Sequence, residues 1–258
     1  MARRLTGAGY ETWGFDVRHR SEFADFQDRM VDTADDFCSR IDVLISVVRD
    51  WRQTQDLCFD VQALFAGADY PKTLIVSSTL SPRILDPLTE RLPDDVIVVD
   101  APMSGAPYRA ENGTLTFMVG GTDAAVAALT PLFKIMGEVV HHLGPSGAGL
   151  TCKVVNNFVA SSSVVAVRRA LSAAQALGVE QKTLLDVMRT SSGGTWFGDN
   201  FDDISWSGQG YDPTNTIGIL EKDMMSFVDA LSDIPEHDAG GFEQTIIDSL
   251  RTLSDLAR

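Results

Sequence analysis

The chain has 258 residues, 44% of them hydrophobic, and a formal net charge of −15 at pH 7. This length and hydrophobic content suit one large domain or two modest ones. The acidic balance, without any basic stripe, argues against nucleic acid and anionic membrane surfaces as partners. No apolar run approaches the roughly 20 residues that span a bilayer, and no membrane partner is expected.

The cysteines indicate the compartment. Cys38, Cys58 and Cys152 lie far apart, with no CxxC motif and no Cys/His cluster. Such an odd, sparse set argues against a disulfide framework and against a zinc site, so no metal is expected. The N-terminal segment has basic residues but lacks the apolar core of a secretory signal. We therefore expect a cytoplasmic protein in a reducing environment.

Up to residue 146, short β-branched runs alternate with helical stretches. The run 42–48 is almost continuously apolar, which is typical of a parallel strand buried on both faces. Ser81-Pro82 predicts a helix start, with serine as the N-cap and proline at the first helical position. The alternation predicts an α/β domain with a parallel, doubly wound sheet. Its strands are expected at Glu11–Val17, Asp42–Val48, Thr73–Ser77, Val96–Asp100, Thr114–Val119 and Val139–Leu143.

The second half of the chain has a helical pattern. A helix over Ala124–Met136, capped by Thr122 or Asp123, closes the first domain. After Gly149 no strand is predicted, and 193–212 has the composition of a loop. We therefore expect a first domain over residues 1–146 and an all-helical domain over residues 147–258. Helices of the second domain are expected at Leu150–Leu177, Lys182–Thr190 and Thr216–Leu231.

Asp16 is the first candidate functional residue. It ends the predicted strand Glu11–Val17, where an acidic residue in a dinucleotide-binding fold accepts hydrogen bonds from the adenosine ribose 2′-OH. Taken alone, an ordinary turn residue is the better interpretation. Arg18 and Arg20 lie close by and could instead hold a 2′-phosphate, so NAD is the preferred cofactor and NADP stays open.

Two further segments follow predicted strands. Hydroxyl side chains of 77–81, with Thr79 among them, stand at a carboxyl strand end, where open α/β sheets bind ligands. Ser104 and Gly105 follow the next strand, and such a pair leaves backbone N–H groups free to bind an anion such as a substrate carboxylate. Helix capping by Ser81 and a tight turn at Ser104 are the alternative interpretations.

Lys153 is the strongest candidate. With Asn156 and Asn157 it follows the spacing i, i+3, i+4, which places all three on one helix face among apolar residues. Burial lowers the pKa of a lysine, which suits proton exchange with an alcohol. The alternative is a lysine that extends to a solvated edge. Lys222-Asp223 is, by itself, an ordinary pair on an exposed helix.

Together these segments resemble the β-hydroxyacid dehydrogenase family, which includes 3-hydroxyisobutyrate dehydrogenase. The pattern GxGxxxKxxNN, at Gly147–Asn157, is the specific part of the resemblance, which covers roughly residues 1–230. Supporting matches are Met1–Tyr10, Ser78–Pro82, Asp100–Gly105, Gly113–Gly121 and Lys222-Asp223.

The resemblance implies a Rossmann-like first domain and an all-helical second domain that commonly forms a homo-oligomer. It implies that Lys153 is the catalytic acid/base of a hydride transfer between a dinucleotide and a small 3-hydroxy acid. Substrate-binding residues are then Ser104, Gly105, Asn156 and Asn157, and cofactor-binding residues are Asp16, Val47, Val48, Thr79 and Lys222.

Two departures from the family pattern bear on this function. The family begins with a strand and a GxGxMG-type loop, and this sequence contains neither; it also has Ala106 where Ser-Gly-Gly is usual. The absent strand is the central one of the Rossmann order, so we expect this chain to bind dinucleotide poorly and its first domain to be the less stable. The alternatives are a truncated or inactive relative with a scaffold role, and an imine reductase on the same fold.

Overall fold

The structure, a computed structural model, describes residues 1–235, 237 and 240–256. It divides into two compact units, Met1–Lys153 and Val154–Arg258. The predicted boundary, at residue 147, lies just before helix α7 (Ala148–Ala176), whereas the compact units meet inside this helix. The difference arises because the first turn of α7 is bonded to the sheet of the first unit.

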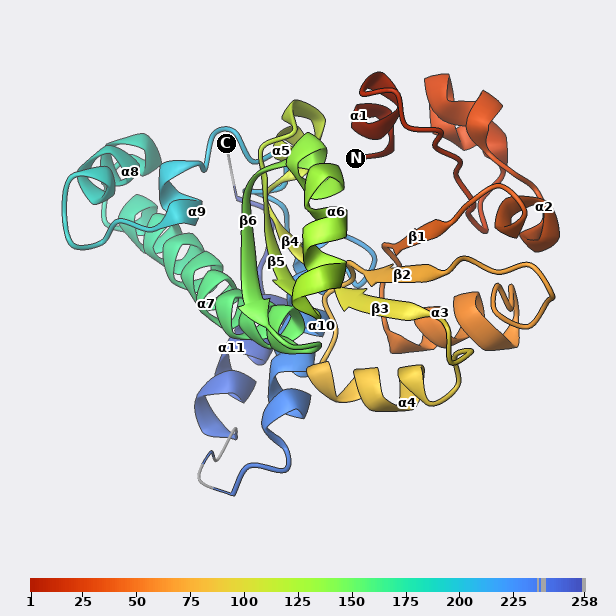
Figure 1. Cartoon of the computed structure of the whole chain (residues 1–258). Helices are drawn as coiled ribbons and strands as arrows, with labels where there is room; N and C mark the ends of the chain where they lie inside the picture. Colours follow the sequence, from red (N-terminus) through yellow and green to blue (C-terminus); the bar gives the residue numbers. More distant parts are fainter. Residues whose placement is uncertain (236, 238–239, 257–258) are drawn as a thin grey trace. The chain divides into compact units, whose positions relative to one another are not determined.

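The first unit is built on one mixed sheet (Figure 1). Its strand order within the described residues is β1-β2-β3-β5-β4, and β6 pairs with β5. The pairs β1–β2, β2–β3 and β5–β6 are parallel, but β5 runs antiparallel to β3 and to β4. The strands are β1 (Val43–Ser46), β2 (Thr73–Val76), β3 (Ile97–Asp100), β4 (Met103–Ser104), β5 (Leu115–Gly120) and β6 (Gly137–Gly144).

The prediction of a purely parallel sheet was therefore wrong at two pairings, because β5 runs antiparallel to both β3 and β4. Strand β4 was not predicted; it pairs through Met103 with Phe117 and through Ser104 with Thr116 of β5. Between β4 and β5 the chain forms only the short helix α5 (Pro107–Asn112). Such a short connection returns the chain antiparallel, because a parallel crossover needs a dozen or more residues.

The predicted strand Glu11–Val17 was also wrong. Only Gly14 forms a β-bridge, to Met30, although Trp13 and Phe15 still pack against the core. In the described residues β1 pairs with β2 and makes no ladder with this segment. Without a neighbouring strand to continue the ladder, residues 11–17 form no strand beyond this single bridge. The other five predicted strands match β1, β2, β3, β5 and β6.

Both faces of the sheet are buried at the central strand β2. In β2, Leu74 and Val76 belong to one hydrophobic cluster, while Ile75 belongs to another on the opposite face, as strand alternation requires. The predicted helix caps are confirmed, since Ser81 and Thr122 accept backbone N–H bonds. Helical segments of this unit are α1 (Ala2–Gly7), η1 (Arg20–Arg29), α2 (Ala34–Cys38), α3 (Trp51–Gln55), η2 (Asp56–Asp60), η3 (Pro82–Ile84), α4 (Leu85–Thr89) and α6 (Asp123–Met136).

In the part that the structure describes, the second unit contains helices and no strands. Val167 and Leu171 of α7 pack in one cluster with Ile217 and Met224 of α10 and Leu250 of α11. The three predicted helices are confirmed, while α9 and α11 were missed. The short α9 begins inside the predicted loop, where the Thr195 side chain caps it. The helices after α7 are α8 (Gln181–Arg189), α9 (Trp196–Asp199), α10 (Thr216–Leu231) and α11 (Gly241–Arg251).

Among the described residues, α7 alone is long and apolar enough by length and composition to cross a membrane. This corrects the prediction that no segment approaches that limit. The apolar side chains Val164 and Leu171 belong to the core of the second unit. Arg168, in the same helix, is buried and donates to three backbone carbonyls. These features are those of a core helix, whose hydrophobicity comes from its burial inside protein.

Candidate active site

The parallel strands of the first unit bring several predicted site residues to one edge. Ser46, Val76 and Asp100 end β1, β2 and β3 and stand side by side in the strand register. Val47 and Val48 directly follow β1, and Thr79 lies three residues beyond β2. Ser104 is the last residue of β4, the short strand that follows β3. This is the carboxyl edge, where open α/β sheets bind ligands.

Two buried hydroxyls lie at this edge: Ser78 belongs to the predicted hydroxyl-bearing segment 77–81, whereas Ser46 was not singled out from the sequence. The Ser46 and Ser78 side chains are buried, and their hydroxyl oxygens have no hydrogen-bond partner among the described residues. Ser46 is the last residue of β1, and Ser78 follows β2 by two positions. A buried hydroxyl without a partner is costly, so this edge contains polar groups that the described chain leaves unsatisfied.

The Ser104-Gly105 turn has a backbone that requires glycine. Gly105 has φ +137°, and a Cβ there would lie 2.9 Å from the side chain of Leu115. Ser104 is held opposite Thr116 by the β4–β5 pairing. Ala106, which replaces the usual second glycine, has φ −69°, a value open to any residue. The backbone of the Ser104-Gly105 turn is therefore held in one conformation by the glycine and by the pairing with β5. Ala106 causes no backbone strain there.

Lys153 lies in the second turn of α7 and is 7% exposed. The start of that helix is fastened to the sheet by the fully buried carboxylate of Asp100. One of its oxygens accepts from the Gly147 N–H at 2.8 Å, and the other accepts from the Leu150 N–H at 2.7 Å. From the sequence Asp100 was expected only at the end of a strand, because its contacts span 47 and 50 residues of chain.

In the second unit, the predicted residues of α7 and α10 form one polar network. The Asn156 amide donates to the Asn157 side-chain oxygen at 3.2 Å, and the Asn157 amide donates to Asp223 at 2.6 Å. The other Asp223 oxygen pairs with the Lys222 ammonium at 2.5 Å. Asp223 is 4% exposed. The structure thus brings Asn157 and Lys222 together around a buried carboxylate that sequence analysis assigned to an exposed face.

Asp16 lines a cavity of about 210 Å³ in the first unit. Its carboxylate accepts from the backbone N–H of Arg18 at 2.9 Å and from the guanidinium at 3.1 and 3.2 Å. Burial raises the pKa of Asp16, but the hydrogen bonds from Arg18 outweigh it, and the net pKa lies below its usual value. Asp16 is therefore an ionised acceptor already paired with a cation. The cavity walls are residues 16–20 and 30–32.

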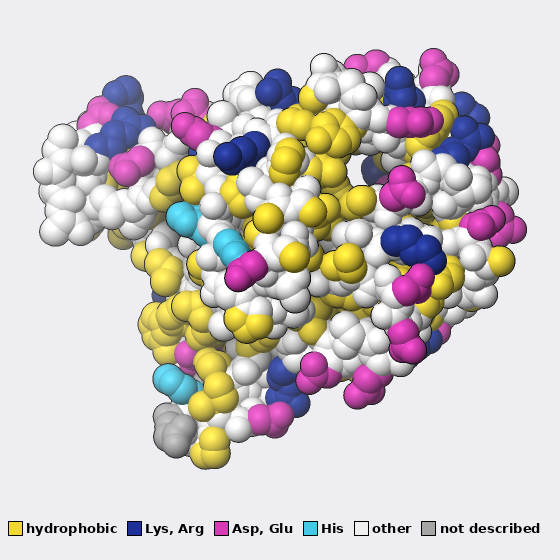
Figure 2. All heavy atoms as spheres, in the orientation of Figure 1, with side chains coloured by type: hydrophobic (Ala, Val, Ile, Leu, Met, Phe, Trp, Pro, Cys, Tyr) yellow, Lys and Arg dark blue, Asp and Glu magenta, His cyan; other side chains and the backbone are white. Residues whose placement is uncertain are grey.

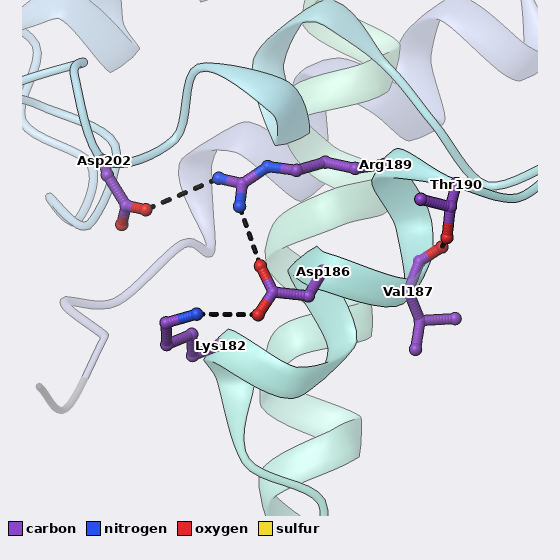
Figure 3. A network of polar contacts seen from close by, with 6 residues as sticks. All are labelled: Lys182, Asp186, Val187, Arg189, Thr190 and Asp202. Carbon is purple, nitrogen blue, oxygen red and sulfur yellow. Dashed lines mark hydrogen bonds and ion pairs between the residues drawn. The ribbon is translucent and has the colours of Figure 1, made fainter.

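Several other ion pairs lie on exposed faces. Figure 3 shows Asp186 of α8 between Lys182 and Arg189, at 2.7 and 2.8 Å. The hydrogen bond from Lys182 lowers the pKa of Asp186. On the face drawn in Figure 2, acidic side chains accompany the basic ones, and the basic ones form no patch. No group of three or more His, Cys, Asp or Glu side chains in the described residues is placed to hold a metal ion.

Family comparisons agree with this two-part architecture. Residues 1–144 match the model of the NAD binding domain of 6-phosphogluconate dehydrogenase, and residues 147–235 match that of NADP-dependent 3-hydroxyisobutyrate dehydrogenase. The fold and site thus define a protein with a dinucleotide-binding domain and a helical partner domain. The chain belongs to the β-hydroxyacid dehydrogenase family.

Individual relatives support the same assignment. The chain is 37% identical over 169 residues to NAD-dependent L-serine dehydrogenase of Pseudomonas aeruginosa, covering 64% of this chain and 55% of that enzyme. It is 28% identical to L-threonate dehydrogenase of Cupriavidus necator, covering 89% of this chain and 78% of that enzyme. The structure of Mycobacterium tuberculosis 3-hydroxyisobutyrate dehydrogenase with L-serine shares the fold, with TM-score 0.75, 24% identity and coverage of 99% and 90%. Three curated relatives are matched over only 55% to 63% of their length.

Proposed function

We propose that the protein is an NAD- or NADP-dependent oxidoreductase that interconverts a small 3-hydroxy acid and its semialdehyde. The buried Lys153 carries this proposal, because it occupies the lysine of the specific motif on a helix fastened to the sheet. Relatives that act on L-serine and L-threonate support a short, polar hydroxy acid as substrate.

The residues present fit part of a dinucleotide site. Asp16 offers an ionised acceptor beside a cavity, as a ribose hydroxyl requires. The unsatisfied hydroxyls of Ser46 and Ser78 add polar groups at the carboxyl edge, near the predicted contacts Val47, Val48 and Thr79. When bound, the dinucleotide supplies the hydride acceptor for oxidation and the hydride donor for reduction.

The protein's own groups supply position and proton transfer. Lys153 takes the proton from the substrate hydroxyl during oxidation and returns a proton to the alkoxide oxygen during reduction. Backbone N–H groups of the Ser104-Gly105 turn hold the substrate carboxylate. Asn157, whose amide is oriented by Asp223, fixes the direction of the hydroxyl. We further propose a cytoplasmic homo-oligomer that contacts neither nucleic acid nor membrane.

The test is an absorbance assay of the chain at 340 nm with NAD or NADP and a panel of hydroxy acids that includes 3-hydroxyisobutyrate, L-serine and L-threonate. Lys153→Ala should lower kcat by about 10²–10⁴, the usual scale of acid/base catalysis, with little change in cofactor affinity. The matched control is Lys134→Ala, which removes an exposed lysine of α6. Because this chain is expected to bind dinucleotide poorly, cofactor binding is measured first by titration. A wild-type chain that binds the cofactor but oxidises none of the panel, or a Lys153→Ala variant with full activity, would overturn the proposal.

A further inference from the structure

Asp100 is a buried carboxylate with no role in the chemistry described above. It is fully buried at the end of β3, and its two oxygens are divided between two backbone N–H groups at the start of α7. A carboxylate at this position offsets the partial positive charge of a helix N-terminus and satisfies N–H groups that lack partners within the helix. The bond therefore sets where α7 begins and how it leaves the sheet.

The same residue leads directly into the predicted carboxylate-binding turn. Ala101 follows it, and the Ala101 carbonyl accepts from the Ser77 hydroxyl at 2.9 Å. One residue further, the Pro102 carbonyl accepts from the Met118 N–H at 3.0 Å. The backbone that runs from Asp100 to Ser104 is thus fixed to β2 and β5, so the turn has little freedom relative to Asp100.

The Asp100 carboxylate is closely packed against two glycines. A Cβ on Gly120 would lie 2.5 Å from one Asp100 oxygen, and a Cβ on Gly149 would lie 2.9 Å from the other. The Gly149 position would also meet the Met118 carbonyl at 2.4 Å. Both glycines allow strand, helix and carboxylate to approach more closely than any other residue would permit. The helix start is consequently held by contact as well as by hydrogen bonds.

We infer that Asp100 is a positioning residue for the reaction: it holds the helix that carries Lys153 at a set distance from the Ser104-Gly105 turn. This inference rests on the proposed function, in which Lys153 and the turn act on the two ends of one substrate. A displacement of about 1 Å between reacting groups can lower turnover by about 10²-fold. Lys153 stands only three residues beyond Leu150, whose N–H the carboxylate holds.

The informative variant is Asp100→Asn, which keeps the side-chain volume but removes the charge and one of the two acceptors. We expect kcat to fall about 10- to 100-fold, the scale of a sub-ångström to ångström misplacement, while KM for the dinucleotide stays unchanged. Amide hydrogen exchange at Gly147 and Leu150 should become faster in the same variant. Ser77→Ala, which frees only the Ala101 carbonyl, is the milder second variant and should raise KM for the hydroxy acid.

Two controls separate positioning from general loss of stability. Asp123→Asn changes an exposed aspartate at the start of α6 and should leave kcat unchanged. Leu88→Ala removes a fully buried side chain of α4, so it should lower the melting temperature without lowering kcat at temperatures where it is folded.

Three results would overturn the positioning role. The first is an Asp100→Asn variant with wild-type kcat, even if its amide exchange is faster. The second is an equal loss of kcat in Leu88→Ala at matched stability. The third applies if Asp100→Asn does not fold: it is a Ser77→Ala variant whose kcat and KM for the hydroxy acid equal those of wild type. A wild-type chain that binds the cofactor but is inactive would instead overturn the proposed function, and the positioning role with it.

Discussion

Replacing Asp223 by asparagine tests whether its buried network supports catalysis. Asp223 accepts from the Asn157 amide at 2.6 Å and pairs with Lys222 at 2.5 Å, and its side chain is 5% exposed. Asp223→Asn keeps the size of the side chain but removes the negative charge. The Lys222 ammonium then loses its counterion in a poorly solvated place, and Asn157 loses a charged acceptor.

The expected loss of kcat follows from the contact between Asp223 and Asn157. A hydrogen bond to a charged group contributes about 1.5–3 kcal/mol, more than a neutral one at about 0.5–1.5 kcal/mol. Exchanging the carboxylate for an amide should therefore cost about 1–2 kcal/mol in the Asn157 contact alone. If that energy orients the substrate in the transition state, kcat falls about 5- to 30-fold, since about 1.4 kcal/mol corresponds to a factor of ten.

The assay combines steady-state kinetics with urea unfolding followed by circular dichroism. Asp186→Asn is the matched control, because Asp186 also pairs with two cations in the same unit but lies on the exposed face of α8 (Figure 3). Exposed pairs contribute little, so this control should match wild type in kcat and in urea midpoint. If Asp223→Asn behaves like Asp186→Asn in both measurements, the network is not part of the catalytic machinery.

Arg168→Met should destabilise the second unit by about 1–3 kcal/mol in urea unfolding, because the buried Ser207 carbonyl loses its donor; the exposed neighbour Arg169→Met should change little, and equal midpoints would refute the reasoning. Arg18→Ala should free the Asp16 carboxylate and raise the NAD over NADP preference about two- to fivefold in titrations of both cofactors, whereas tighter NADP binding would show that Asp16 does not govern the pocket. Burial raises the pKa of Cys58 to about 12, so only about one thiol in 10⁴ is ionised at pH 8. Cys58 should accordingly stay unmodified in peptide mapping after a disulfide reagent is applied to the folded chain, and react once urea is added.

Local patterns in the sequence were enough for most strands, for the longer helices and for the specific motif. Five predicted strands and the three predicted helices of the second unit are present, because hydrophobic period and caps such as Ser81 and Thr122 act over a few residues. The family assignment also follows from short motifs, and Lys153 was singled out by an i, i+3, i+4 spacing that any helix converts into a common face. These features depend on neighbours in the chain.

The tertiary structure decided what depends on distant partners. The segment 11–17 has strand composition but no ladder to join, so it is only extended. β4 is a strand only because the chain folds back against β5. Asp100 and Asp223 gained their roles in the same way, through contacts 50 and 66 residues away along the chain. A carboxylate at a strand end or on a helix face carries no local sign of being buried, because burial is set by what packs over it.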